Sequence, residues 1–466
     1  MKRLRTLLDV AESAGTPVSD PQITWTRADL ADLTASLRDQ IDKADLAGAC
    51  LCLPLDSSLG ALAALIAVLD SDASAALIAK PATGATPDWP AFCDAVLIPP
   101  DAATGSVTGQ ILSLPGTGNS RGQDRVYLRT SGTTGTPKWA VHDTERLILN
   151  ARACIARLKL SSQDRVMIPV PFHHMYGLGA ALLPSILAGA AISLVPRGNP
   201  LEIYRAQRTF EPTAMFLVPS QCRSIMALNR NAGQSRLVVV AGDKLAPDEA
   251  AAFEEKHGTL VCLYGSTELG AITAGLPDDP VALRHLTAGP PMDGMTLELD
   301  DTSPEEAAAD VRSMRVRAQA GLLGYADTKG DIIAPAPDIW TTGDLIRLHD
   351  GNRIEVLGRA DHAVNRDGLL VHMGEIEACL TRADGVGQAA VVAAGRSRRG
   401  AGLVAFCTLT RADAASEDAI LQHCRTLLPP RAVPDHLVIL DALPMLASGK
   451  VDRRQLVTEA ESRLES

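Results

Sequence analysis

Hydrophobic runs of strand length alternate with segments of helical periodicity over the first half of the chain. "GACLCLPL" (48–55) has the composition of a buried strand, "SSLGALAALIAVLDSDAS" (57–74) that of an apolar helix, and "SAALIAK" (74–80) that of the next strand. The same alternation returns in apolar segments at 164–172, 177–190, 191–196, 214–219 and 236–242. It is typical of an α/β fold in which helices pack on parallel or mixed sheets.

The pattern changes twice toward the C-terminus. Between about 285 and 357, short strand-like segments separated by Gly, Asp and Pro turns predict a small β-rich subdomain. From 358 onward, helical and strand-like segments are mixed, which predicts a small α+β domain. A length of 466 residues also exceeds one ordinary domain. We therefore expect a large N-terminal domain over residues 1–360 and a C-terminal domain over residues 361–466.

Composition and charge narrow the functional classes. The formal net charge of -11 and the pI near 5.4 oppose binding to a nucleic-acid backbone, which depends on clustered Lys and Arg. No apolar run approaches the ~20 residues that span a bilayer, and Asp9 and Glu12 interrupt the basic start before a signal-type region forms. Nine scattered cysteines without a Cys-x-x-Cys pair predict core thiols in a reducing compartment. We expect a cytoplasmic protein with no nucleic-acid partner and no membrane span.

The stretch "TSGTTGTPK" (130–138) concentrates backbone freedom and hydrogen-bond donors before a lysine. Gly132 and Gly135 allow conformations closed to other residues, and Pro137 biases Thr136 away from helix. Such a loop after the strand "RVYLR" suits phosphate oxygens, because its amides, its hydroxyls and the Lys138 ammonium can all donate. It lacks the Gly-x-x-x-x-Gly-Lys-Ser/Thr order of a P-loop. A Ser/Thr/Gly surface turn has the same composition, so both readings stay open for this stretch alone.

Four further stretches bear on that choice. They are "YGSTELG" (264–270), "WTTGDL" (340–345), "LGRADHAVNRDG" (357–368) and "SGKVDRRQL" (448–456), with weaker matches at "PFHHMYGLG" (171–179) and "AGDKL" (241–245). Together with the loop, and in this order, they resemble the motifs of the acyl-adenylate-forming superfamily: acyl-CoA synthetases, adenylation domains and luciferases. The resemblance implies ATP- and Mg²⁺-dependent activation of a carboxylic acid, followed by transfer of the acyl group to a thiol.

The resemblance also implies roles for individual residues. Lys450 matches the catalytic lysine, Thr267 the hydroxyl that meets the α-phosphate, Glu268 the Mg²⁺ carboxylate and His174 the gate of the acid pocket. The nucleotide set comprises Thr130, Ser131, Gly132, Thr133, Thr134, Gly135, Lys138, Gly242, Asp243, Tyr264, Gly265, Ser266, Asp344 and Arg359. Within it, Asp344 would accept both ribose hydroxyls and Tyr264 would stack beside the base.

The remaining assignments concern the thiol and the acid. Asp361 matches the hinge about which the C-terminal domain rotates as a lid, and Gly368 the position where the pantetheine arm passes. The acid pocket would be lined by His173, Gly177, Val218, Val240, Gly265 and Gly270 beside the gate His174. Its glycines and small aliphatic side chains predict room for a medium or long acyl chain or an aryl acid. The adjacent histidines lack further ligands at metal spacing, so we expect no metal there.

Two departures from the family pattern concern thiol transfer. Leu370 stands where the family often has Arg or Gln, and Asn365 stands where many ligases have lysine. We therefore keep three hypotheses: a CoA ligase, a ligase that loads a carrier protein's phosphopantetheine, and a non-catalytic nucleotide-binding relative. The cluster of Arg396, Arg398 and Arg399 could contact CoA or an acidic carrier, or simply be solvated. The non-catalytic relative is disfavoured because the chain retains Thr267, Glu268, Asp344, Arg359 and Lys450.

Overall fold

The chain forms two compact units. The computed structural model describes residues 15–82, 87–101, 104–106, 108–115, 124–130, 138–196, 198–228, 230, 232–300, 311–359, 363–366, 369–397, 400–411, 414–446 and 451–465. The first unit comprises residues 1–296 and 317–340, and the second comprises residues 297–316 and 341–466. The two units are groups of residues that contact one another, and their limits do not locate the hinge about which a domain rotates. The expected domain boundary at residue 360 therefore stays a prediction.

Two eight-stranded sheets organise the first unit. One has the order β14-β13-β12-β11-β9-β10-β1-β2, and the strands from β13 to β1 pair in parallel. Its strands are β1 Pro17–Ser19, β2 Thr24–Thr26, β9 Arg165–Ile168, β10 Ala191–Leu194, β11 Ala214–Leu217, β12 Ser235–Val240, β13 Gly258–Ser266 and β14 Gly270–Ala274. These bounds confirm the expected α/β fold with parallel strands.

The second sheet of this unit has the order β18-β17-β8-β7-β4-β3-β5-β6. Its strands are β3 Cys50–Leu55, β4 Ser74–Ala79, β5 Ala95–Ile98, β6 Gln110–Ser113, β7 Arg125–Arg129, β8 Trp139–Asp143, β17 Gly324–Ala326 and β18 Ile332–Pro335. The strands β7, β4, β3 and β5 pair in parallel, whereas β7 and β8 form an antiparallel pair. This sheet is therefore mixed.

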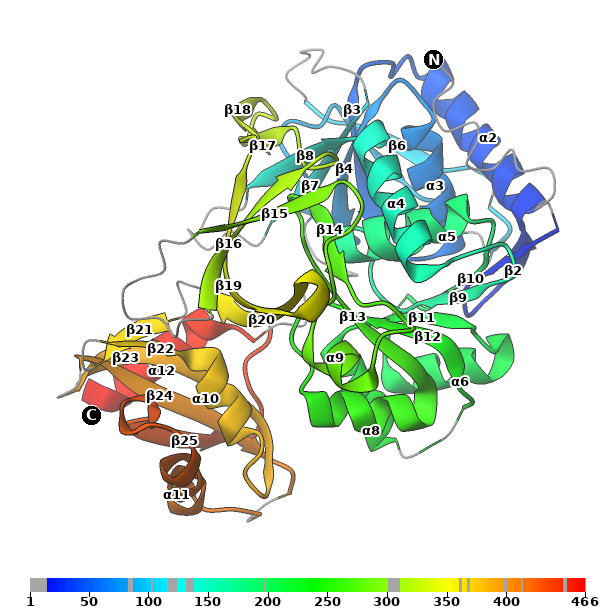
Figure 1. Cartoon of the computed structure of the whole chain (residues 1–466). Helices are drawn as coiled ribbons and strands as arrows, with labels where there is room; N and C mark the ends of the chain where they lie inside the picture. The colour runs from blue at the N-terminus through cyan, green and yellow to red at the C-terminus, as the bar shows by residue number, and fades with distance from the viewer. Residues whose placement is uncertain are drawn as a thin grey trace. The chain divides into compact units, whose positions relative to one another are not determined.

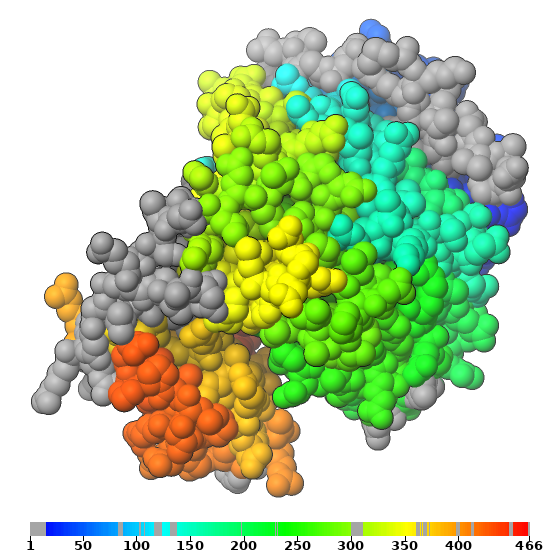
Figure 2. Space-filling model, in the orientation of Figure 1, coloured from blue at the N-terminus to red at the C-terminus, as the bar shows by residue number. Residues whose placement is uncertain are grey.

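Helices of the first unit pack on and between these sheets. They are α2 Arg27–Lys43, α3 Leu59–Leu69, α4 Thr144–Leu158, α5 Leu183–Leu187, α6 Pro200–Phe210, α7 Pro219–Ala227, α8 Pro247–His257, α9 Val281–Leu286 and the π-helix η3 Tyr176–Leu182. All residues of α3 are buried, as its run of Ala and Leu predicts. One hydrophobic core contains residues of α2, α3, α4 and α5 and of strands of both sheets. Figure 1 shows these four helices beside the sheets. In Figure 2 the cyan and green segments of the chain cover one continuous surface of this unit.

Two smaller sheets lie in the second unit, apart from the strand-end residues 295–296, 317–318 and 340, which belong to the first unit. The four-stranded sheet has the order β15-β16-β19-β20 and is formed by β15 Met295–Asp300, β16 Val311–Ala318, β19 Trp340–His349 and β20 Arg353–Arg359. The five-stranded sheet is formed by β21 Ala363–Arg366, β22 Leu369–His372, β23 Val386–Ser397, β24 Gly400–Leu409 and β25 His436–Leu440. Its helices are α10 Met373–Leu380, α11 Glu417–Leu427 and α12 Arg453–Glu465. This content confirms the expected β-rich segment and the α+β segment that follows it.

The nine cysteines are all unpaired, and eight of them are buried. They serve as small apolar residues of the cores, as the sequence predicts. Among the described residues, no helix is long and apolar enough to cross a membrane.

A buried ion cluster ties α8, α9 and β13 together. Arg284 donates to both carboxylate oxygens of Glu254 at 2.6 Å, and His285 Nε2 lies 2.8 Å from Glu254 Oε2. The Arg284 and His285 side chains are each only 6% exposed. Burial of the carboxylate opposes its ionisation, but the hydrogen bonds from Arg284 and His285 outweigh burial and lower the pKa of Glu254. The charged carboxylate is therefore the form that the fold favours.

We expect Glu254→Gln to reduce the free energy of unfolding by about 3 kcal/mol, because it leaves the Arg284 charge buried without its counter-charge. The native contribution is present above the ordinary glutamate pKa and is lost as pH falls through the lowered pKa. Urea unfolding at pH 7 and pH 3 measures both effects. The exposed neighbour Glu255, changed to Gln, is the matched control and should alter stability little. An equal loss in both variants would contradict the role of the cluster.

Candidate active site

The predicted phosphate loop joins two neighbouring strands of the mixed sheet. β7 ends at Arg129 and β8 begins at Trp139, and these two residues pair in the antiparallel register. The Thr130 amide and hydroxyl both donate to the Lys138 carbonyl, at 2.9 and 3.1 Å. The two ends of the loop, Thr130 and Lys138, are thus hydrogen-bonded to each other. The predicted residues Ser131, Gly132, Thr133, Thr134 and Gly135 lie outside the described residues.

The "YGSTELG" stretch forms the end of β13 and the turn into β14. Tyr264, Gly265 and Ser266 close β13, and the register with β14 shifts between Tyr264 and Gly265. The Ser266 hydroxyl accepts the Leu269 amide at 3.2 Å, so it shapes the turn. Thr267 and Glu268 lie in this turn and are both half-buried. The turn therefore presents the two residues that the resemblance assigns to the α-phosphate and to Mg²⁺.

Two side chains from other strands hold this turn. His142 Nε2 on β8 lies 2.8 Å from the Thr267 carbonyl oxygen. Burial lowers the pKa of His142 to about 4, so the ring is neutral at pH 7 and Nε2 carries the proton that it donates. The Tyr325 hydroxyl on β17 donates to Glu268 Oε1 at 2.6 Å, and the Leu322 amide donates to the Glu268 carbonyl at 2.7 Å. The position of Glu268 is thus fixed from both β8 and the segment leading to β17.

The predicted acid-pocket residues gather at the carboxyl ends of parallel strands. Val218 follows β11, Val240 ends the neighbouring β12, and Leu217 pairs with Val240. The Tyr176 hydroxyl of η3 lies 3.0 Å from the Leu217 carbonyl and 2.8 Å from the Val239 carbonyl. The π-helix that follows His174 is therefore attached to the same strand ends. Crevices outside the carboxyl ends of strands are where α/β sheets usually bind ligands.

The two histidines before η3 differ in environment. Their ring centroids are 4.2 Å apart, but His174 is exposed and His173 is half-buried. Burial, followed by the neighbouring His174, lowers the pKa of His173 to about 3. Its buried Nδ1 has no hydrogen-bond partner among the described residues. The His173 ring is therefore uncharged at pH 7 and would line the predicted acid pocket without a charge.

The glycines of the predicted pocket are required by the backbone. A Cβ on Gly177 would lie 2.2 Å from the Pro171 carbonyl oxygen, and one on Gly265 would lie 2.2 Å from the Gly270 carbonyl oxygen. Gly270 has a φ of +71° and abuts the Asn150 side chain. These three positions exclude a side chain whatever the ligand. The expectation that they make room for a long acyl chain is therefore not supported by them.

The predicted ribose residues of the second unit lie side by side. Asp344 on β19 pairs with Arg359 on β20. Arg359 Nη1 donates to the Thr342 carbonyl at 3.0 Å, and the Asp344 amide donates to the Thr342 hydroxyl at 3.1 Å. Gly343 has a φ of +75°, and its missing Cβ would lie 3.1 Å from Arg359 Nη2. The guanidinium is therefore packed on the Thr-Gly-Asp turn.

Comparison with known families identifies the chain. The model of the AMP-binding enzymes matches residues 50–312, and the model of their C-terminal domain matches residues 375–450. The chain belongs to the AMP-binding enzymes. This membership confirms the resemblance to the acyl-adenylate-forming superfamily.

Individual relatives are distant. A salicylyl-CoA synthase / salicylate adenylyltransferase of Streptomyces sp is 27% identical over 347 residues, which are 72% of this chain and 63% of that protein. Nonribosomal peptide synthetase 2 of Gibberella zeae is 28% identical over 422 residues, which are 85% of this chain and 8% of that protein. The chain thus spans less than two thirds of the length of each. The crystal structure of the anthranilate CoA ligase AuaEII with anthranoyl-AMP has a TM-score of 0.84 at 19% identity, over 100% of this chain and 98% of that one. That likeness confirms the fold.

The turn of this AMP-binding enzyme fits a magnesium ion. Among the described residues, Glu268 makes one side-chain hydrogen bond, through Oε1, so Oε2 would be the atom to bind a cation. The described residues contain no group of three or more His, Cys, Asp or Glu that could hold a metal by themselves. A single carboxylate completed by substrate phosphates is the usual protein contribution to Mg²⁺. The residues present therefore suit a cation that arrives with ATP.

For the other predicted site residues of this AMP-binding enzyme, the structure shows fewer contacts. Asp243 is exposed, accepts its neighbour's amide at 2.8 Å and follows Gly242, whose φ is +95°. Asn365 and Leu370 pair across β21 and β22. Asp361, Gly368, Arg398, Arg399 and Lys450 lie outside the described residues, and Arg396 is exposed on β23. Their assigned roles stay predictions.

Sequence reasoning missed four residues that organise the site of this AMP-binding enzyme: Asn150, His142, Tyr176 and Tyr325. Asn150 Nδ2 donates to the Gly179 carbonyl of η3 at 2.7 Å, and its Oδ1 accepts the Ala271 amide of β14 at 2.9 Å. A signal existed for it, because this lone amide occupies the buried face of α4. The other three depend on contacts between segments far apart in the sequence, which local patterns do not reveal.

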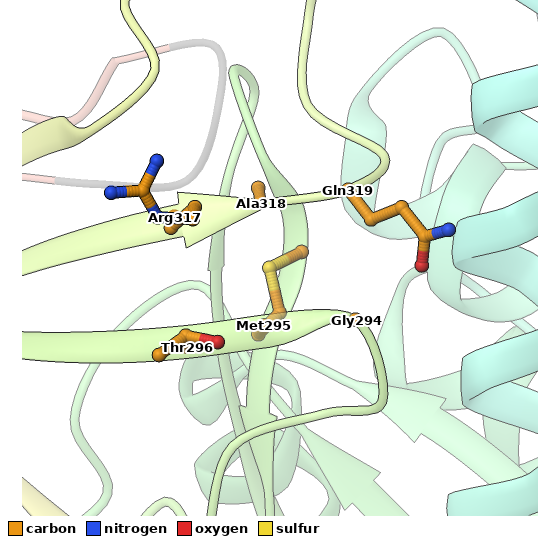
Figure 3. Close-up of a pocket in the computed structure, with 6 residues that line it drawn as sticks. All are labelled: Gly294, Met295, Thr296, Arg317, Ala318 and Gln319. Carbon is orange, nitrogen blue, oxygen red and sulfur yellow. The ribbon is translucent and has the colours of Figure 1, made fainter.

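A surface hollow of the first unit is separate from these residues. Its volume is about 350 Å³, and it is lined by Gly294, Met295, Thr296, Arg317, Ala318 and Gln319. Figure 3 shows the Arg317 and Gln319 side chains directed away from each other. It contains no predicted site residue and no convergent polar groups, so it is not a candidate for the acid or nucleotide site.

Proposed function

We propose that the chain is an AMP-forming acid–thiol ligase. The observation that supports this most directly is the meeting of the Lys138 end of the phosphate loop with the Glu268 turn. Lys138 Nζ lies 5.4 Å from the centroid of the Tyr325 ring, and the hydroxyl of the same ring donates to Glu268 at 2.6 Å. The Lys138 ammonium and a carboxylate suited to Mg²⁺ thus both contact Tyr325, and Glu268 follows β13, the strand next to β12.

In the first half-reaction, an oxygen of the substrate carboxylate attacks the α-phosphorus of ATP. The bond between the α-phosphorus and the bridging oxygen breaks, pyrophosphate leaves, and an acyl-adenylate forms. Both reactants are anions, so the protein must supply positive charge and alignment rather than proton transfer. Lys138, the hydroxyls and amides of residues 130–135 and the Thr267 hydroxyl would bind the phosphates, and Mg²⁺ on Glu268 would neutralise their charge. Lys450 would bridge the carboxylate and the α-phosphate.

In the second half-reaction, the thiol loses its proton to solvent and its sulfur attacks the acyl carbonyl carbon. The bond between that carbon and the phosphate oxygen of AMP breaks, and AMP leaves. No atom is oxidised or reduced in either step. Asp344 would hold the ribose hydroxyls of the nucleotide in both steps, with Arg359 beside it. Asp361 would be the hinge and Gly368 the passage for the pantetheine arm. Because ATP and CoA are cytoplasmic cosubstrates, we propose that the enzyme works in the cytoplasm.

We propose that the substrate acid carries no charge apart from its reacting carboxylate. Among such acids, we propose aromatic acids as the preferred class. The pocket residues His173, Gly177, Val218, Val240 and Gly270 carry no charge at pH 7, so they offer no counter-ion to a second carboxylate or an ammonium. The relatives named above support this choice, since salicylate and anthranilate are aromatic acids. Alternatively, the acceptor is the phosphopantetheine of a carrier protein, because the relative from Gibberella zeae is a peptide synthetase.

The test is pyrophosphate exchange with Mg²⁺–ATP across aromatic, fatty and amino acids, followed by product analysis with CoA or a phosphopantetheinylated carrier. We expect exchange with aromatic acids and thioester formation with CoA. Thioester formation only on the carrier would favour the alternative acceptor. If no acid supported exchange or AMP release, the ligase proposal would be wrong and the non-catalytic relative would replace it.

The hinge assignment makes a separate prediction. A proline at position 361 restricts backbone rotation there, so we expect Asp361→Pro to leave acyl-adenylate formation within about threefold and to slow thioester formation about a hundredfold. Single-turnover measurements with and without CoA separate the two steps. Equal losses in both half-reactions would argue against a hinge at Asp361.

A further inference from the structure

Tyr325 lies between the two charged groups of the candidate nucleotide site. Its hydroxyl donates to Glu268 Oε1 at 2.6 Å, and its ring lies under Lys138, with Nζ 5.4 Å from the centroid. The ring also lies near Trp340, whose ring centroid is 5.9 Å away at an interplanar angle of 55°. One side chain therefore contacts both the expected metal ligand and the end of the phosphate loop.

The backbone holds Tyr325 in this place. β17 is paired on both sides, with Tyr325 opposite Ala140 of β8 and opposite Ala334 of β18. The Leu323 amide donates to the Val141 carbonyl, and the Leu322 amide to the Glu268 carbonyl, each at 2.7 Å. The strand that carries the ring is thus joined directly both to the strand after Lys138 and to the turn that carries Glu268.

The chemistry of each contact differs. The Tyr325 hydroxyl is the donor to the Glu268 carboxylate, because an ionised carboxylate can only accept. A hydrogen bond to one carboxylate oxygen orients the other oxygen toward a cation, as outer partners of metal ligands commonly do. The face of an aromatic ring attracts an ammonium and restrains it without competing for its hydrogen bonds to phosphate.

We propose that Tyr325 is a positioning residue that holds Glu268 Oε2 ready for the Mg²⁺ of Mg²⁺–ATP and seats Lys138 against the same nucleotide. The inference rests on the proposed function, because it takes ATP as the ligand. It assigns two separable roles to one side chain: the hydroxyl acts through the carboxylate on the metal, and the ring acts through the ammonium on the phosphates.

Calorimetric binding of ATP, with Mg²⁺ and with EDTA, tests both roles without turnover. We expect Tyr325→Phe to reduce the gain in ATP affinity that Mg²⁺ confers roughly tenfold, while metal-free affinity stays within about twofold. Tyr325→Leu should lose that gain and also weaken metal-free binding about threefold, because the ring is gone. A wild-type gain retained in Tyr325→Phe would overturn the role of the hydroxyl, and unchanged metal-free binding in Tyr325→Leu would overturn that of the ring.

Tyr127→Phe is the matched control. Tyr127 is buried in the same sheet, on β7, and its hydroxyl donates to the Gly330 carbonyl at 3.3 Å. Its loss should lower thermal stability slightly and leave the Mg²⁺-dependent gain unchanged. A reduction as large as that of Tyr325→Phe would mean a general effect of losing a buried hydroxyl and would sink the proposal.

The outcomes also separate this inference from the proposed function. A wild type that binds Mg²⁺–ATP but never releases AMP with any acid would refute the ligase, and the affinity comparison would still decide the role of Tyr325. Adenylate formation by the wild type, with an unaltered gain in Tyr325→Phe, would refute only the positioning role. A wild type whose ATP affinity does not depend on Mg²⁺ would overturn the positioning role as well.

Discussion

Replacing Glu268 by glutamine is expected to slow acyl-adenylate formation about 10²- to 10³-fold at saturating ATP, which corresponds to ~3–4 kcal/mol. The amide has the same shape and can still accept the Tyr325 hydrogen bond on its oxygen, so the turn should keep its fold. The change removes only the negative charge that a hard cation requires. We therefore also expect the half-saturating Mg²⁺ concentration to rise at least about tenfold. Pyrophosphate exchange measured over a Mg²⁺ series gives both values.

Glu145→Gln is the control for this variant. Glu145 is exposed in the first turn of α4, in the same unit and close in sequence to β8. Its neutralisation removes the same charge from the surface and should leave the Mg²⁺ dependence unchanged. A Glu268→Gln enzyme with the wild-type Mg²⁺ dependence would remove Glu268 from the metal site, even if its overall rate were lower.

The local hydrophobic pattern predicts best the helices and strands that consist almost entirely of apolar residues. The Ala/Leu segment expected at 57–74 forms α3 over Leu59–Leu69, and the strand expected at 48–55 forms β3 over Cys50–Leu55. Each is buried on all sides, so an uninterrupted apolar run is the only signal needed. The strand "RVYLR" expected before the phosphate loop forms β7 over Arg125–Arg129.

Contacts within the site were less accessible to sequence. The residues of the hydrogen bond between Tyr325 and Glu268 are 57 positions apart, and those of the bond between His142 and Thr267 are 125 apart. These pairs depend on which strands are neighbours and in which register, and neither is encoded in a local window. The resemblance assigned both Asp344 and Arg359 to the ribose region, and the structure places them in register, but the resemblance could not reveal why they adjoin. The reason is that Arg359 packs on the turn that carries Asp344.

The glycines illustrate a second limit. Sequence reasoning treated Gly177, Gly265 and Gly270 as space left for a substrate. The structure shows a carbonyl oxygen or the Asn150 side chain where a Cβ would stand, so each glycine is required whether or not a substrate lies beside it. A glycine in a sequence reports that a side chain is excluded, but only the three-dimensional neighbour tells whether a ligand or the protein's own backbone excludes it.

Lys450→Ala should have the largest effect on catalysis. We expect acyl-adenylate formation to fall at least about 10³-fold, or ~4 kcal/mol, while the affinity for ATP changes by no more than about twofold. Lys450 is the only lysine after Lys329, whereas fourteen arginines occur in the same part of the chain. The residues that flank it in sequence are hydrogen-bonded to each other. Met445 pairs with Val451 in an antiparallel bridge, and the Asp452 amide donates to the Pro444 carbonyl at 2.7 Å. The segment thus starts and ends on ordered backbone.

A lysine among arginines matters because the two cations are not equivalent. An ammonium is a compact charge that can be shared between a carboxylate and a phosphate, whereas a guanidinium needs a planar, bidentate partner. We therefore expect Lys450→Arg to recover less than about a tenth of the lost rate. Arg463→Ala is the control, because Arg463 is half-exposed and pairs with Glu459 of its own helix at 2.9 Å. Rapid-quench measurement of acyl-AMP formation distinguishes the three variants. Undiminished adenylation by Lys450→Ala would exclude this ammonium from the reaction, and full recovery in Lys450→Arg would show that charge alone, rather than its compact form, is required.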